Sequence, residues 1–323
     1  MCYQNTGTPK FYIDKTAYLY STGIGVSDSG ENCFGLGASN FSRFTGTGAT
    51  DYINFNNHNN ILRSESYNFV AVLGHTLASD ITDGKLTDIR VGFTDGTFLG
   101  NAQEDGAGKS VNVTSSHFEP DYDGFSIMPF EEFNLQHYGV WIQVTDSVGG
   151  DVSQIGRVAL GTYYDMPHSP ELSLTISHEY EGIKKQETTG GSTLSYVNYY
   201  KPPDWGNLQA WQLGGWDRKY SGRRVWDLSW NHLSDSDIEP YNYHIDSSSG
   251  YSSWKDNWFT NVIHYTNGGQ LPFIFCPDPS IVYDDSTWTI PEFAICRLDM
   301  KTFKRKQVAN GIYNIKVKIK ESW

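Results

Sequence analysis

The chain has 323 residues, enough for one large all-β domain or two domains of ordinary size, with a substantial core. Aromatic residues make up 15% of it and charged residues only 19%, which favours strands joined by turns over helices. The formal net charge of −13 disfavours general nucleic-acid binding, because a polyanion would be repelled on average.

The four cysteines form no CxxC pair and have no ligand-rich flanks, so we predict no metal site. Cys276 and Cys296 stand in apolar contexts, which is typical of buried free thiols. Neither a Walker loop nor a Rossmann glycine fingerprint occurs, so we expect no cofactor. No apolar segment resembles a signal peptide or approaches the roughly 18 residues of a membrane helix, so we expect neither.

Several segments in the first half have the alternation or apolar character of strands. Phe11 opens a first strand followed by a turn, and the apolar run of residues 69–73 predicts a buried strand. Residues 89–93 and 140–144 alternate in the manner of half-buried strands. The prolines of the MPHSP segment then indicate a linker, and we place a domain boundary near Pro167.

After this boundary, alternation predicts strands near residues 171–180, 223–231 and 311–321, and a short helix is expected near residues 254–261. The middle strand places three apolar side chains on one face, namely Trp226, Leu228 and Trp230. The last strand has an apolar face and an opposite basic face, which carries Lys316, Lys318 and Lys320.

Tryptophans are the most unusual feature of the second half. They act either as core residues and interface anchors, or as platforms that stack on sugar rings. The basic strand face is either solvated, guarding a sheet edge, or seated against an acidic neighbouring subunit, and the last role predicts salt-sensitive assembly. Our interface candidates combine both groups: Trp205, Trp211, Trp216, Trp226, Trp230, Lys316, Lys318 and Lys320.

No motif has catalytic specificity, and we predict no catalytic residues and no enzyme. His75 follows a buried strand, and because no nucleophile elbow occurs we predict a framework role for it. His178 begins a pattern like HExxH, but position 182 is glycine, so we predict a partly buried strand histidine. His168 is expected to fix the linker.

Acidic residues offer carboxylate pairs of the kind that glycoside hydrolysis uses, although each pair is equally typical of a polar loop. The pairs are Glu131 with Glu132, Asp121 with Asp123, and Asp235 with Asp237. Calcium binding by the Asp-rich loops stays open, although the EF-hand loop is absent.

Four stretches spread along the chain resemble a group of tail-tip or baseplate proteins of environmental tailed bacteriophages. They are NFVAVLGHTLAS, in which Thr76 replaces the usual Asn; QIGRVALGTYYDMPHSPELSLTISHEYEG; SGRRVWDLSWNHLSDSD; and the ending from LPFIFCPDPS to KVKIKESW. The resemblance implies a galactose-binding-like jelly-roll and a role like that of a distal tail protein, which forms a ring between tail tube and tip. It also implies that His75 is a framework residue.

The sequence therefore predicts an all-β protein with two β-sandwich-type domains, a jelly-roll in residues 1–166 and an assembling β domain in residues 167–323. We expect a virion structural protein, made in the host cytoplasm and located in the tail. Its expected partners are further copies of itself, as a trimer or hexamer ring, and other phage tail proteins, with no nucleic acid. One alternative is a carbohydrate-binding module that attaches to a host glycan, and another is a polysaccharide-degrading enzyme.

Overall fold

The computed structural model describes residues 6–21, 42–44, 50–56, 67–73, 89–94, 110–112, 125–133, 139–145, 153–180, 184–196, 223–240, 257–280 and 293–322. Antiparallel strands account for most of the secondary structure in these ranges, and the helices are short. The predicted all-β fold is therefore confirmed. Within the described ranges, no helix has the length and apolar character that crossing a membrane requires.

The largest element is a ten-stranded sheet with the order β11-β14-β18-β16-β15-β1-β10-β4-β7, in which β17 pairs additionally with β18. Its strands are β1 (Lys10–Asp14), β4 (Tyr67–Leu73), β7 (Phe125–Phe133), β10 (Arg157–Asp165), β11 (Thr175–Glu179), β14 (Arg223–Ser234), β15 (Phe273–Cys276), β16 (Ala294–Leu298), β17 (Arg305–Ala309) and β18 (Ile312–Glu321). The strands predicted near residues 69–73, 171–180, 223–231 and 311–321 correspond to β4, β11, β14 and β18.

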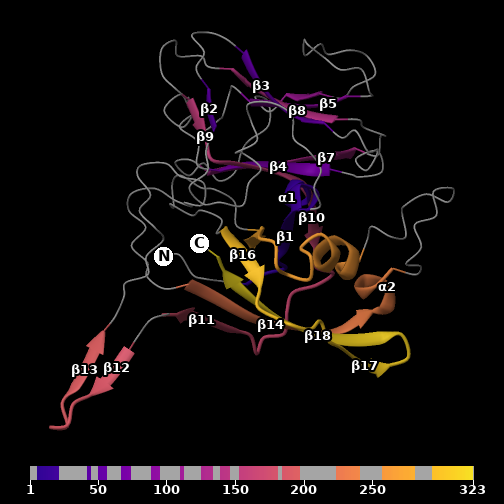
Figure 1. Cartoon of the computed structure of the whole chain (residues 1–323). Helices are drawn as coiled ribbons and strands as arrows, with labels where there is room; N and C mark the ends of the chain where they lie inside the picture. The colour runs from indigo at the N-terminus through magenta and orange to yellow at the C-terminus, as the bar shows by residue number, and fades with distance from the viewer. Residues whose placement is uncertain are drawn as a thin grey trace.

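The ten-stranded sheet contains strands from both sides of Pro167. Strand β1 lies between β10 and β15, so that Tyr12 is opposite Tyr163 on one side and opposite Ile274 on the other. The two halves of the chain therefore share one hydrogen-bonded sheet (Figure 1). The division into two domains at this proline, and the jelly-roll in the first half, stay predictions.

Three smaller sheets accompany the large one among the described residues. A four-stranded sheet has the order β3 (Thr50–Asn56), β8 (Gly139–Thr145), β5 (Ile89–Thr94) and β6 (Ser110–Asn112), and β2 (Ser42–Phe44) pairs with β9 (Ser153–Ile155). The strands predicted at residues 89–93 and 140–144 are thus confirmed as β5 and β8. The third is a hairpin of β12 (Lys184–Glu187) and β13 (Thr193–Tyr196), at the opposite end of the molecule from β3 and β8 (Figure 1).

In the part of the chain that the structure describes, three short helices interrupt the strands: α1 (Lys15–Ser21), α2 (Asp235–Ile238) and a π-helix (Phe259–His264). Sequence reasoning predicted a turn after β1, where α1 in fact begins. Asp14 caps this helix, because its Oδ1 accepts hydrogen bonds from the Ala17 backbone N–H at 3.1 Å and from the Thr16 hydroxyl. The helix expected at residues 254–261 is found as the π-helix, which begins later in the chain.

Both faces of the large sheet are covered at its centre, because successive residues of β1 contribute to different core clusters. Phe11 and Ile13 belong to one cluster, and Tyr12 belongs to the other. The first cluster is rich in aromatic rings, and the Phe11 and Trp258 rings meet edge to face with centroids 4.9 Å apart. Strand β1 is therefore buried on both sides, which fixes the centre of the sheet.

The two described cysteines lie in these cores. Cys276 belongs to the cluster that contains Tyr12, and Cys296 belongs to the cluster that contains Phe11. Both are free thiols and fully buried, as predicted. Burial raises the pKa of the Cys296 thiol well above its ordinary value, so it stays protonated and inert.

Candidate functional site

The tryptophans proposed as interface anchors divide into two groups. Trp205, Trp211 and Trp216 lie outside the described residues. Trp226 and Trp230 are 1% and 0% exposed, because they occupy the core face of β14. Their side chains stabilise the core and leave no surface for a partner, so among the predicted candidates only the lysines of β18 present described surface.

The polar atom of the buried Trp230 side chain, its indole nitrogen, also has a hydrogen-bond partner. Its indole N–H donates a hydrogen bond to the backbone oxygen of His168 at 3.0 Å. The His168 ring is exposed, and its Nδ1 lies 2.8 Å from the backbone oxygen of Ser169. The contact joins the segment between β10 and β11 to β14, so the predicted role of His168 in fixing the linker is served through its backbone.

The lysines of β18 alternate with buried side chains as the sequence predicts. Ile315, Val317 and Ile319 are at most 2% exposed, and the lysines lie on the opposite face. Each lysine meets a carboxylate from a neighbouring segment, and the Nζ–O distances are 3.2 Å for Lys316 to Asp227, 2.9 Å for Lys318 to Asp299, 3.2 Å for Lys318 to Glu179, and 2.8 Å for Lys320 to Glu179.

These contacts alter the acid–base behaviour of the face. The hydrogen bond from Lys320 lowers the pKa of Glu179 below its ordinary value, and Lys318 acts in the same direction. The hydrogen bond to Asp299 raises the pKa of Lys318, and the one to Glu179 adds to it. Three lysines therefore face three carboxylates within the chain, and the predicted contact of this face with an acidic neighbouring subunit stays a prediction.

Strand β11 forms one edge of the ten-stranded sheet. Its inner side pairs with β14, from Thr175 opposite Asp227 to Glu179 opposite Arg223, and no described strand pairs with its outer side. Ile176 packs partly against the core, while most of the strand is exposed. This edge therefore offers a row of backbone hydrogen-bonding groups.

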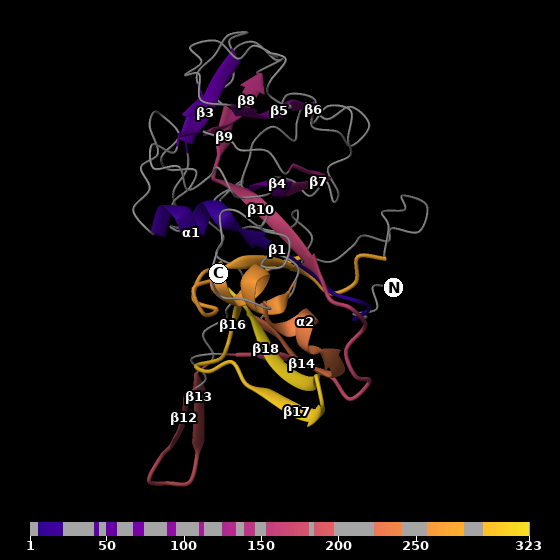
Figure 2. The same cartoon turned by 90° about the vertical axis from the view of Figure 1, so that its right-hand side faces the viewer.

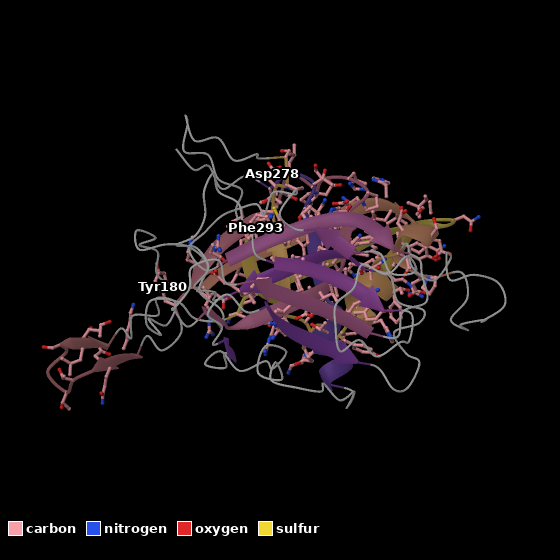
Figure 3. The ribbon with its side chains drawn as sticks, turned by 90° about the horizontal axis from the view of Figure 1, so that it is seen from above. Tyr180, Asp278 and Phe293 are labelled. Atoms are coloured by element: carbon pink, nitrogen blue, oxygen red, sulfur yellow. The ribbon has the colours of Figure 1, made fainter. Side chains whose placement is uncertain are left out.

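The hairpin β12–β13 leaves the sheet just after β11 and projects away from the rest of the described chain (Figure 2). Its turn is held by the Thr188 N–H, which donates to the Ser192 oxygen at 2.8 Å, and by Gly191, whose φ of 80° suits a residue without Cβ. Every side chain from Lys185 to Ser195 is exposed. Tyr180, which is 43% exposed, lies between the body and the hairpin (Figure 3).

The residues considered for catalysis either have structural roles or lie outside the side chains that the structure describes. His178 is exposed, so the prediction of a partly buried histidine is wrong, because the core beneath β11 reaches no further than Ile176. The carboxylate of Asp237 accepts a hydrogen bond from the Ser234 N–H at 2.9 Å, while the Ser234 hydroxyl accepts one from the Asp237 N–H at 3.3 Å. This capping box begins α2 and occupies the Asp237 side chain.

The remaining predictions about acid–base groups fall outside the side chains that the structure describes. These residues are His75, Asp121, Asp123, Glu131 and Glu132. Within the described ranges, no three or more His, Cys, Asp or Glu side chains are grouped to hold a metal ion.

One polar cluster was not found by sequence reasoning. The Tyr18 hydroxyl of α1 lies 3.3 Å from Nε2 of His264 at the end of the π-helix, and the Lys15 ammonium lies 4.5 Å from the Tyr265 ring centroid. The residues come from segments almost 250 positions apart, so no local pattern links them. The cluster fastens α1 to the π-helix, and the contact between the lysine and the aromatic ring supports a buried charge.

Comparisons with protein-family models, with curated proteins and with solved structures gave no match. The fold and the residues described above are therefore the basis for a functional proposal.

Proposed function

We propose that the chain is a virion structural protein of a tailed bacteriophage, a tail-tip or baseplate component of the distal-tail type that connects tail tube to tip by homo-oligomeric assembly. The observation that supports this best is the combination of β11, at one edge of the described sheet, and a projecting hairpin on the same body (Figure 1). An edge and an arm give each copy two different surfaces, as a head-to-tail contact requires. The resemblance of four sequence stretches to tail-tip proteins supports the same proposal.

A connector also has to be rigid, and the large sheet suits that requirement. Its central strand is covered on both faces by cores containing Phe11, Tyr12 and Ile13. The proposed partners are further copies in a ring of three or six, together with other tail proteins. The proposed location is the virion tail, after synthesis in the host cytoplasm, and the proposal assigns no catalytic residue or cofactor to the chain.

The carbohydrate-binding alternative requires aromatic rings on the surface. Trp226, Trp230 and Trp258 are at most 1% exposed, so these three rings cannot stack on a sugar in this fold. The described tryptophans therefore give that alternative no support.

Native mass spectrometry of the purified chain, with negative-stain images of the same sample, tests the proposal. We expect a discrete species of three or six copies that appears as a closed ring. A chain that remains monomeric over the whole accessible concentration range, and also in the presence of the tail tube of its own phage, would contradict the proposed function.

A further inference from the structure

No described residue buries a face of the hairpin β12–β13, although two-stranded sheets ordinarily need such support. An isolated two-stranded hairpin is marginally stable in water, and three or more strands or a packed face are needed for independent stability. Its described side chains are all exposed, and Leu194 alone among them is a large apolar residue, 48% exposed. The hairpin is therefore built as if a further strand were to join it.

The free edges differ in their charge. Strand β12 carries Lys184, Lys185 and Glu187, and β17 carries Arg305 and Lys306. Charged side chains of this kind guard an edge against pairing with another strand, because pairing would crowd or desolvate them. Both strands are therefore protected edges.

Strands β13 and β11 lack such protection. Strand β13 has the sequence TLSY and no charged residue. Strand β11 has the sequence TISHE, with no lysine, arginine or proline, and its Glu179 is already engaged by Lys318 and Lys320. Among the edges whose side chains the structure describes, these two are chemically suited to pair with each other.

We infer that β13 of one copy pairs with the outer edge of β11 in the next copy, so that the hairpin extends the neighbour's sheet. This inference rests on the proposed function, because it names the contact by which copies assemble. Pairing of the two strands within one chain is disfavoured by connectivity. Only residues 180–183 separate β11 from β12, so β12 is the strand that a local turn would bring to this edge, and β13 would have to pass around it.

The side chains fit this contact. Ile176 of β11 packs partly against the aromatic core, and Leu194 alternates with Thr193 and Ser195 on β13. With Leu194 placed beside Ile176, the apolar layer of the neighbour's sheet continues onto the hairpin and Leu194 loses its exposed surface. The charged strand β12 then becomes the outer edge. Because each copy offers one arm and one edge, the contact is heterologous and closes into a ring when the rotation between copies allows it.

Disulfide trapping between copies tests the contact directly. A Ser195→Cys variant carrying a size tag is mixed with untagged Thr175→Cys or Ser177→Cys and oxidised. With Leu194 beside Ile176, an antiparallel arrangement brings Ser195 to Thr175 and a parallel one brings it to Ser177. We expect one of the two mixtures to give a tagged–untagged dimer well above the wild-type background.

Lys185→Cys is the matched control for Ser195→Cys, because Lys185 is the cross-strand partner of Ser195 and is equally part of the exposed hairpin. It should give no dimer above background with either β11 variant. Equal trapping of Ser195→Cys and Lys185→Cys would show that the hairpin contacts the β11 edge only non-specifically and would contradict the inference. The absence of any trapped dimer in an assembled sample would also overturn it.

A charge placed on β13 provides the second measurement. Leu194→Lys should weaken association at least about tenfold in native mass spectrometry, since an apolar contact is replaced by a charge at a strand edge. Gln186→Lys adds the same charge to the cross-strand neighbour on β12 and should leave association unchanged. Circular dichroism checks that both variants keep the fold.

The outcomes separate this inference from the proposed function. A ring that forms equally well with Leu194→Lys and gives no trapped dimer would refute the β13–β11 contact while keeping the connector proposal. Trapped dimers in open filaments without closed rings would support the contact and contradict the ring. A wild-type chain that never associates would contradict both.

Discussion

The buried ion pair between Arg224 of β14 and Glu321 of β18 is the sharpest test of how the sheet is held together. Both side chains are only 3% exposed. The Glu321 carboxylate accepts hydrogen bonds from the Arg224 backbone N–H at 3.0 Å, from Nε at 3.2 Å and from Nη2 at 3.0 Å. We expect Glu321→Ala to lower the free energy of unfolding by about 3–5 kcal/mol, the range for a buried pair that loses one partner.

The size of this effect follows from what the substitution leaves behind. The Arg224 guanidinium keeps its hydrogen bond to the Phe293 oxygen at 3.2 Å but loses the carboxylate that compensates its charge. Combining Glu321→Leu with Arg224→Met removes both charges, and we expect that double variant to recover most of the loss, because desolvation of a buried pair offsets much of its attraction. Lys316→Ala is the control: this side chain is 71% exposed and its ion pair should contribute less than about 1 kcal/mol.

Chemical denaturation followed by circular dichroism, at one fixed protein concentration, measures these differences. The ring of Trp226 lies 5.3 Å from the Arg224 guanidinium, so tryptophan fluorescence gives a second probe at the site. A loss in Glu321→Ala no larger than that in Lys316→Ala, or a double variant as unstable as the single one, would contradict the role assigned to this ion pair.

Two further predictions concern a close backbone approach and the charged face. A Cβ at position 161 would overlap the Ile13 carbonyl oxygen, so Gly161→Ala should lower the free energy of unfolding by about 3 kcal/mol, whereas Gly190→Ala, with open space around it, should be nearly neutral in the same denaturation assay. The hydrogen bond from Lys320 lowers the pKa of Glu179 below its ordinary value, so the stabilisation from this pair is complete well above that ordinary value and is lost as the pH falls through the folded-state pKa. The loss in Glu179→Gln, about 0.5 kcal/mol for this partly exposed pair at about pH 6, should therefore shrink when unfolding is measured at about pH 3. A difference that grows on acidification would contradict the pairing.

Local patterns predicted which side chains of a strand share a face, but they did not predict which distant segments pack against that face. Trp230 could be assigned to a strand face from alternation, yet its role as core residue or interface anchor depended on what covers that face. The core cluster that contains Trp230 includes Phe11 and Trp258, which belong to distant segments. The helix α1 was missed although Asp14 before Thr16 and Ala17 carries a capping signal, because the apolar residues around it favoured a strand and a turn.

The sequence by itself determined the all-β class, the alternating faces of β14 and β18, and the burial of the two cysteines, because these follow from side-chain period and composition within short windows. Only the tertiary structure decided that β1 joins strands from both halves, that the lysines of β18 meet Asp227, Glu179 and Asp299, and that β12 and β13 project as an arm. Strand order and register depend on contacts between residues far apart in the chain. Their free energy comes from burying apolar side chains of distant strands in shared cores, and no local pattern records which strands will share them.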